Sequence, residues 1–348
     1  MRIAVDAMGG DHHPSAPVQG AMEALAAQDD LTVLLVGRPD VITAALGEQA
    51  KQFAGRFEIL AASEVIGPEE EPAAAVKSKR DSSIVVGLEA CRAGRAQGLV
   101  SAGNTGALTA GSLFRFGRIR SVERPAMPVV LPTVDRHGLV LLDIGAGTDA
   151  DAHNLLDYAV MGSLYAEKVR DIARPRVALL NIGTEERKGT RDKREAFSLL
   201  QGSDLNFVGN IEGRELFGGK ADVVVTDGFV GNVVIKTLEG FAWGISQVMG
   251  HDLRHSGVIT LLGAAMAART LRNLRKRIDY TEYGGVPFLG VNGVCVKCHG
   301  SSGTKAMRNG ILAAARIITA EVVPEIARSV AAARARADQD PDGRGRGA

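Results

Sequence analysis

Residues 98–111 read GLVSAGNTGALTAG, and the organisation of the whole chain can be worked outward from this stretch. Leu99–Ala102 has the apolar character of a buried strand, Gly103–Gly106 forms a turn with little side-chain bulk, and Ala107–Gly111 opens a helix. A strand that enters a helix through such a turn leaves unpaired backbone N–H groups and the positive end of the helix dipole at one place. That arrangement attracts an anion, most often phosphate or carboxylate.

The same strand–turn–helix unit recurs along the chain. Strands are predicted at Arg2–Asp6, Leu31–Gly37, Phe57–Ala61, Met127–Leu131, Gly138–Asp143, Arg176–Asn181, Leu205–Gly209, Ala221–Asp227 and Val294–Lys297. They are apolar without two-residue alternation, which is typical of a parallel sheet covered by helices on both faces. The predicted fold is therefore α/β, a three-layer α/β/α sandwich with a mostly parallel, Rossmann-like sheet.

Polar turns follow the carboxyl ends of these strands, where open α/β sheets bind their ligands. We expect all six turns to share one edge of the sheet: Asp6–Asp11, Asn104–Gly106, Asp143–Gly147, Gly183–Lys188, Asn210–Glu212 and Asp227–Asn232. Glycine closes many strand-to-helix turns without any ligand, so a single turn carries little weight. Six together, each with an Asn, Asp, Lys or Glu, favour a binding site.

Composition narrows the classes of function. The 41 basic and 40 acidic residues give a net charge of +1, so we expect no nucleic-acid partner on global electrostatic grounds. Asp6 interrupts the region where a signal peptide would need its apolar run, and no stretch approaches the roughly 20 apolar residues of a membrane span. We expect a cytoplasmic protein with one α/β domain over residues 1–333 and a disordered tail over 334–348.

Three other motifs are weak or misleading. No G-x-x-x-x-G-K-[ST] occurs, and the G-x-G-x-x-G fingerprint is only fragmentary, so nucleotide binding has little support. Cys295–His299 matches the C-x-x-C-H spacing of haem attachment, but it begins on an apolar strand of a chain with no export signal. A lone C-x-x-C also supplies too few ligands for structural zinc. We therefore expect neither a metal nor a cofactor.

Val258–Ile278 is predicted as a basic amphipathic helix rather than a sheet unit. Such a helix can lie on an anionic membrane surface, or it can pack in a dimer interface with a solvated charged face. From the residues alone both interpretations stay open. The candidate membrane-contact residues are Leu262, Met266, Arg272, Arg275 and Lys276.

Several blocks resemble one family in order along residues 1 to about 320. They are MRIAVDAMGGDHHP, VSAGNTGALTAG, ERPAMP, LLDIGA, LLNIGTEERKG, FVGNIEGRELF, ADVVVTDGFVGNVVIKTLEG, YGGVPFLGVNG and VKCHGSS. In these blocks the chain is similar to the PlsX family of phosphate acyltransferases. Departures from the family pattern are small: His13, Gly147 and Cys298 replace residues that are more usual there.

The resemblance implies a reaction, a fold and partners. Acyl–acyl-carrier protein and inorganic phosphate give acyl phosphate and free carrier protein, for phospholipid synthesis. The fold is akin to the phosphate acetyltransferase and isocitrate dehydrogenase group. The family also implies a homodimer, peripheral membrane association, and delivery of acyl phosphate to a membrane glycerol-3-phosphate acyltransferase. A helical arm over about residues 240–280 would serve dimer and membrane contact.

Phosphate is already largely a dianion at neutral pH, so the site does not need to deprotonate it. Three tasks remain: to hold phosphate, to stabilise the thioester oxyanion and to assist the departing thiolate. For holding phosphate, the candidates are Asn104, Thr105 and Gly106 with Lys188 as the cation. For the thioester oxyanion, Asn232 or Asn210 offers an amide donor. His299 and Lys297 are candidates to assist the departing thiolate. Further candidates for phosphate or pantetheine binding are Asp6, Gly10, Asp11, Gly183, Asp227 and Gly228.

Each assignment has a structural alternative. Asn104 has the sequence position of a helix cap, Lys188 that of a solvated loop charge, and His299 that of a buried structural histidine. Two basic runs are candidates for docking the acidic carrier protein: Lys77, Lys79 and Arg80, and Arg115, Arg118 and Arg120. Two other functions also stay open, a nicotinamide-linked dehydrogenase on a related fold and a non-catalytic membrane scaffold.

Overall fold

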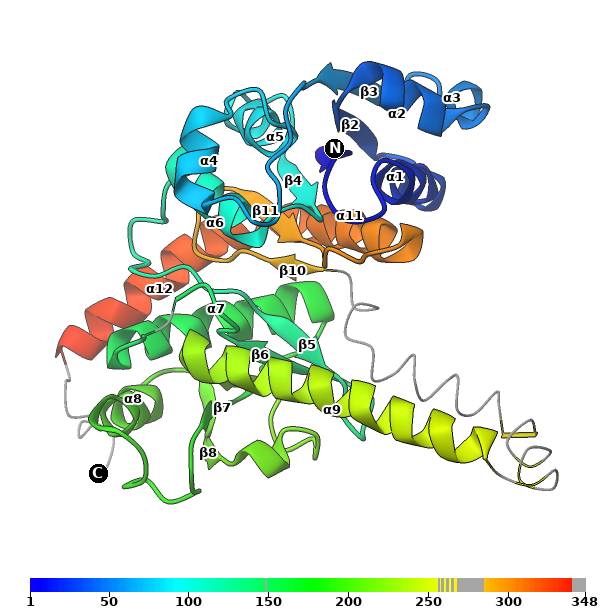
Figure 1. Cartoon of the computed structure of the whole chain (residues 1–348). Coiled ribbons are helices and arrows are strands. Elements are labelled where there is room, and N and C mark those ends of the chain that lie inside the picture. The colour runs from blue at the N-terminus through cyan, green and yellow to red at the C-terminus, as the bar shows by residue number, and fades with distance from the viewer. Residues whose placement is uncertain are drawn as a thin grey trace.

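The computed structural model describes residues 1–147, 149–255, 257, 260, 263, 266, 267 and 285–339. Its strands form two sheets (Figure 1). The order of the first is β10 (Val286–Pro287), β11 (Val294–Lys297), β4 (Gly98–Ser101), β1 (Arg2–Asp6), β2 (Thr32–Gly37) and β3 (Phe57–Ala61). The order of the second is β5 (Val129–Leu131), β6 (Leu139–Leu142), β9 (Val223–Val225), β7 (Arg176–Leu180) and β8 (Asn206–Ile211). Among the described strands, the edge strands β10 and β5 pair antiparallel with their neighbours, and the other pairs are parallel.

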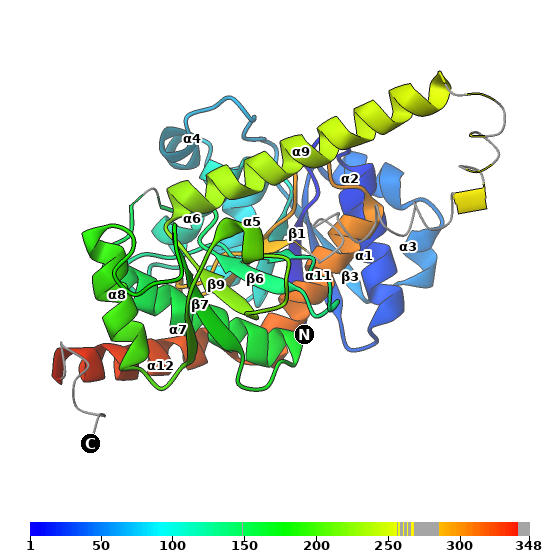
Figure 2. The same ribbon diagram turned by 90° about the horizontal axis from the view of Figure 1, so that it is seen from below.

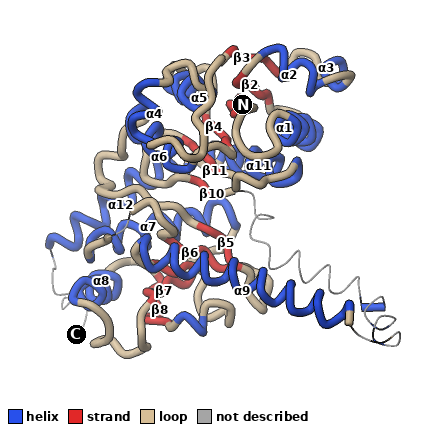
Figure 3. The backbone as a smooth tube through the Cα atoms, viewed as in Figure 1, coloured by secondary structure: helices blue, strands red, loops and turns tan. Residues whose placement is uncertain are grey.

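Helices cover both faces of the first sheet (Figure 3). Side chains alternate between them: Ile3 and Val5 of β1 join one hydrophobic cluster, and Ala4 between them joins another. The first face carries α1 (Ser15–Ala27), α2 (Pro39–Leu46) and α11 (Thr304–Thr319); the second carries α4 (Pro72–Ser78), α5 (Ser83–Arg92) and α6 (Thr105–Arg115). The short α3 (Gln49–Gln52) follows α2. Burial on both faces explains why these strands are apolar throughout.

The second sheet is covered in the same way. On one face lie α7 (Ala152–Arg170) and α8 (Arg191–Gln201), and the other is covered by Ile235 of α9 (Gly228–Arg254) together with Leu216, just after the 3₁₀ turn Gly213–Glu215. At 1.5 Å per residue, the 27 residues of α9 measure about 40 Å. Figures 1 and 2 show its second half projecting beyond the sheets.

Two features join the sheets. Ala126 and Leu289 exchange backbone hydrogen bonds of 3.0 and 2.9 Å, and Met127 accepts a 3.2 Å bond from Ile144 at the end of β6. One hydrophobic cluster also draws on both sheets together with α1, α7, α11 and α12 (Val322–Gln339). The strands therefore share a common core.

The α/β class with mostly parallel strands is confirmed, but the single edge expected for all six polar turns is wrong because the strands are divided between two sheets. The tail predicted from residue 334 is also wrong at its start, since α12 continues to Gln339. Arg334 is held there by bonds of 2.8 and 2.7 Å to the buried carboxylate of Asp157.

Candidate active site

At the carboxyl edge of the first sheet, Asp6 ties two turns together. Its carboxylate is fully buried and accepts bonds from the Met8 N–H (3.0 Å) and the Ser101 hydroxyl (2.7 Å). Ser101 in turn accepts a 3.0 Å bond from the Gly103 N–H. A β-carbon at Gly9 would lie 2.6 Å from the Gly103 nitrogen, so the turns after β1 and β4 need a glycine there to pack together. Asp6 thus positions backbone and does not face a ligand.

Asn104 uses both ends of its carboxamide inside the protein. Oδ1 accepts a 2.9 Å bond from the Ala107 N–H and caps α6, while Nδ2 donates to the carbonyls of Gly67 (2.9 Å) and Pro68 (3.2 Å). The structural alternative for Asn104 is the one observed. What this turn can offer an anion is therefore the backbone N–H groups of Thr105 and Gly106 in the first turn of α6.

The turn after β11 carries the two candidates for assisting the thiolate. Lys297 donates to the carbonyls of Ala102 (3.2 Å) and Cys298, and burial lowers its pKa. Its ammonium group thus holds the ends of β4 and β11 together. His299 is exposed, and its Nδ1 lies 2.8 Å from the Ser301 hydroxyl and accepts a 3.3 Å bond from the Ser301 N–H. These contacts are local to the turn, so the ring remains at its surface.

Gly10 and Asp11 bring the turn after β1 against the turn after β11. The Asp11 N–H donates a 2.8 Å bond to the Gly300 carbonyl. Gly10 has φ +88°, and a β-carbon there would lie 2.9 Å from the same oxygen, so this contact requires glycine. Three turns of the first sheet are consequently packed together.

At the second sheet, the dominant feature is the buried carboxylate of Asp143, which accepts bonds from four backbone N–H groups. The donors are Met127 (2.9 Å), Gly145 (3.1 Å), Ala146 (3.0 and 3.1 Å) and Gly147 (3.1 Å). Burial raises the pKa of Asp143, while these four donors act in the opposite direction. The carboxylate thereby fixes the turn that follows β6.

This turn packs tightly on the start of α9. A β-carbon at Gly228 would lie 2.0 Å from the Gly147 carbonyl oxygen, and one at Gly231 would lie 1.8 Å from the Asp143 carbonyl oxygen. The exposed side chain of Asn232 lies next to this contact, 3.8 Å from where a β-carbon of Gly145 would be. The geometry thus places Asn232 on a rigid support.

Asp227 caps α9 through a 2.8 Å bond from the Val230 N–H, and Lys193 lies 3.4 Å from its other oxygen. Lys193 also donates a 3.2 Å bond to the Thr226 hydroxyl, and burial lowers its pKa although Asp227 opposes the shift. Sequence reasoning missed Lys193, because it follows the polar turn and begins an amphipathic helix like many solvated lysines.

The loop after β7 presents Lys188. Its ammonium is half exposed and 3.8 Å from the Glu185 carboxylate, and the Asn181 carboxamide holds its carbonyl through a 3.0 Å bond. Asn210 is buried and donates 2.9 Å to the Glu185 carbonyl, so it fastens this loop rather than facing an oxyanion. A β-carbon at Gly183 would meet the side chains of Glu185 and Lys188 at 2.7 and 2.9 Å.

The predicted site residues thus form two groups. Asp6, Gly10, Asp11, Asn104, Thr105, Gly106, Lys297 and His299 lie at the first sheet; Gly183, Lys188, Asn210, Asp227, Gly228 and Asn232 lie at the second. Figures 1 and 2 both place the start of α9 on the same side of the molecule as α4 and α6.

Of the candidate membrane-contact residues, Met266 is exposed. The others lie outside the described residues: Leu262, Arg272, Arg275 and Lys276.

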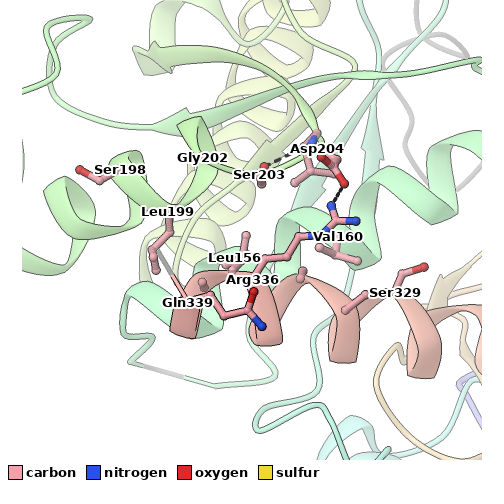
Figure 4. A pocket seen from close by; sticks show the side chains of 14 residues that line it. Leu156, Val160, Ser198, Leu199, Gly202, Ser203, Asp204, Ser329, Arg336 and Gln339 are labelled. Atoms are coloured by element: carbon pink, nitrogen blue, oxygen red, sulfur yellow. Dashed lines mark hydrogen bonds and ion pairs between the residues drawn. The ribbon is translucent and has the colours of Figure 1, made fainter. Parts of the chain in front are cut away.

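Two cavities lie apart from these turns. One, of about 450 Å³, is lined by α7, α8 and α12, with Arg336 and Asp204 paired at its side (Figure 4). The other, of about 480 Å³, lies between the ends of α5, α6 and α11 and the start of β11.

In the described part of the chain, no helix has the length and apolarity to cross a membrane. Among the same residues, no three His, Cys, Asp or Glu side chains are grouped to hold a metal.

Comparisons with solved structures agree on the fold. A phosphotransacetylase from Streptococcus pyogenes matches with a TM-score of 0.59 at 17% identity, covering 93% of this chain and 94% of that one. A branched-chain phosphotransacylase from Enterococcus faecalis matches with a TM-score of 0.57 at 14% identity, covering 91% and 99%.

Comparisons of sequence go further. A protein-family model described as "Fatty acid synthesis protein" matches residues 1–325. A phosphate acyltransferase from Heliobacterium modesticaldum is 52% identical over 311 residues, covering 89% of this chain and 92% of the relative. Another from Thermoanaerobacter pseudethanolicus is 44% identical over 330 residues, covering 95% and 97%. The chain therefore belongs to the fatty acid synthesis protein family, that of the phosphate acyltransferases.

Proposed function

We propose that this acyltransferase transfers the acyl group of an acyl–acyl-carrier protein to inorganic phosphate. The observation that carries the proposal is that Lys188 and Asn232 follow the carboxyl ends of two neighbouring parallel strands of the second sheet, β7 and β9. A cation and an amide donor suit an oxyanion beside a carbonyl that becomes negatively charged.

The reaction needs positioning more than activation. A phosphate oxygen attacks the thioester carbon, the carbonyl oxygen becomes an oxyanion, and the C–S bond then breaks to release the thiolate. Lys188 holds phosphate, and the Asn232 amide donates to the oxyanion. The thiolate then takes a proton, for which the exposed His299 in its imidazolium form is the candidate donor, since Lys297 is occupied by two carbonyls.

Kinetics with separated substrates test these roles. Purified protein incubated with palmitoyl–carrier protein and phosphate should form acyl phosphate, which hydroxylamine traps as a hydroxamate. Lys188→Ala should raise the KM for phosphate, and Asn232→Ala should lower kcat with a smaller effect on that KM. Bound NAD together with an absence of hydroxamate would contradict the proposal.

The projecting half of α9 supports the peripheral association and the dimer that the family resemblance implies. Phe241 is 65% exposed and Trp243 68%, and large exposed apolar side chains mark interaction sites. We place the contacts with a second copy and with the membrane surface here, where acyl phosphate would pass to a membrane glycerol-3-phosphate acyltransferase. Phe241→Glu with Trp243→Glu should weaken co-sedimentation with anionic vesicles and shift the sedimentation coefficient towards a monomer. Unchanged values in both assays would refute this placement.

A further inference from the structure

The helices α4 and α6 lie side by side along their length. Pro72 at the start of α4 contacts Gly106, where a β-carbon would lie 2.4 Å from its ring. Near their far ends, the Lys77 ammonium lies 5.3 Å from the centre of the Phe114 ring. The basic run at the end of α4 therefore lies beside the carboxyl end of α6, although the two are more than 30 residues apart in the sequence.

Some of the positive charges of the two basic runs are not paired with carboxylates. Lys79 pairs with Glu70 at 2.8 Å and Arg115 with Glu89 at 3.0 Å, so these two cations stabilise the local structure. The other four are exposed, and none forms an ion pair with a carboxylate in the described residues: Lys77, Arg80, Arg118 and Arg120. Arg118 donates to the Glu123 carbonyl beyond the end of α6. We call Lys77, Arg80 and Phe114 the α4–α6 patch.

Phe114 gives the patch an apolar centre. Half of its surface is exposed, although a phenylalanine of a covering helix is normally turned inwards. The Lys77 ammonium lies over the ring and forms a cation–π pair with it. An exposed aromatic side chain with a cation over its ring has the composition of an interface centre, where charge steers encounter and the ring supplies contact area.

The patch is one helix length from the Asn104 turn, which belongs to the first-sheet group of candidate site residues. Phe114 lies nine residues along α6 from Thr105, which corresponds to about 14 Å at 1.5 Å per residue. The acidic run Glu69–Glu71 is at the opposite end of α4, where the Glu71 carboxylate accepts bonds from the first N–H groups of that helix. A partner docked on the patch would therefore meet cations, with its flexible arm within reach of the Asn104 turn.

We propose that the α4–α6 patch is the docking surface for the acyl carrier protein, an acidic partner that presents its acyl group on a flexible thioester arm. This inference rests on the proposed function, because it assigns the source of the acyl thioester. The cations attract the carrier's acidic surface, and Phe114 packs against its apolar residues. The fit is one of charge, and salt should weaken it.

The test compares two acyl donors that differ only in the carrier. Lys77→Glu with Arg80→Glu should raise the KM for palmitoyl–carrier protein at least tenfold and flatten its dependence on salt. The same variant should leave kcat/KM for palmitoyl-pantetheine unchanged, since that donor has no protein surface. Phe114→Ala should raise the KM for the carrier substrate alone. Lys51→Glu, which reverses an exposed cation on α3, is the matched control. It should leave the KM for the carrier substrate and the kcat/KM for palmitoyl-pantetheine unchanged.

Binding of fluorescently labelled carrier protein, followed by anisotropy, separates the two proposals because it needs no turnover. Weaker carrier binding by the charge-reversed variant supports the patch even if acyl phosphate is not formed, an outcome that would refute only the proposed reaction. Unchanged carrier binding, or an equal loss of kcat/KM with both donors, overturns the docking surface. Lost binding to anionic vesicles with unchanged carrier binding would assign the patch to a membrane instead.

Discussion

Replacing Asp143 with asparagine removes one oxygen from a carboxylate that four backbone N–H groups share. If the amide oxygen takes the place of Oδ1, it keeps the bonds from Met127, Gly145 and Ala146. The new NH₂ group then faces the Gly147 N–H, which loses its 3.1 Å acceptor. The substitution therefore sets two donors against each other in a buried place.

The cost can be worked from these contacts. An N–H without an acceptor costs about 1–3 kcal/mol when it is buried, and the partly buried Gly147 N–H belongs at the lower end of that range. The three bonds that remain lose their charge assistance, about 1 kcal/mol each. Against this, the neutral side chain avoids the burial that raises the pKa of Asp143. We expect a net loss of roughly 2–4 kcal/mol in the free energy of unfolding.

Urea unfolding at pH 7 measures this loss as a lower midpoint. Asp149→Asn is the matched control: Asp149 is exposed in the same loop and pairs with Arg124, so its replacement should cost about 1 kcal/mol or less. If Asp143→Asn unfolds at the same urea concentration as the control, the four bonds do not stabilise the turn and the reasoning is refuted. A double-mutant cycle with Asn232→Ala adds a functional test, because losses in kcat that fail to add would show that Asp143 acts through Asn232.

Three further outcomes are expected. Arg334→Ala leaves the Asp157 carboxylate buried without its partner and should lower the free energy of unfolding by about 3–5 kcal/mol, measured in urea. Burial lowers the pKa of Lys297, so the unfolded chain binds more protons between the folded pKa and 10.5; relative to Lys297→Met, the wild type should gain stability as pH rises through that window. Burial raises the pKa of all three cysteine thiols to about 12, so they should react with a disulfide reagent at pH 8 only after unfolding, and rapid labelling of the native protein would contradict this.

Runs of apolar residues in the sequence predicted the buried strands well. The sequence places Arg2–Asp6 and Val294–Lys297 as strands, and the structure has β1 and β11 at those residues. It does not reveal that the strands form two sheets, because an apolar strand buried on both faces carries no mark of its neighbour. Strand order is set by contacts far apart in the chain.

For the candidate site too, the sequence predicted local features and missed those that depend on distant contacts. Turn chemistry predicts where polar residues gather, but it cannot say which atoms the fold uses internally. Asn104 has its carboxamide committed at both ends, and Asn210 supports a loop, although both have the residue type of an oxyanion donor. Lys193 shows the converse, since its contact with Asp227 joins α8 to α9 and depends on how those helices pack.

The position of β11 has a consequence for synthesis on the ribosome. It pairs with β4 inside the first sheet, and α11 covers the same sheet against α1, although both come from the last fifth of the chain. The amino-terminal strands thus leave the ribosome long before the segment that completes their core, while the second sheet has all of its strands by residue 225. The second sheet can therefore pair its strands before the first sheet is complete. Until β11 and α11 are made, the first sheet leaves apolar surface uncovered, to which a chaperone can bind.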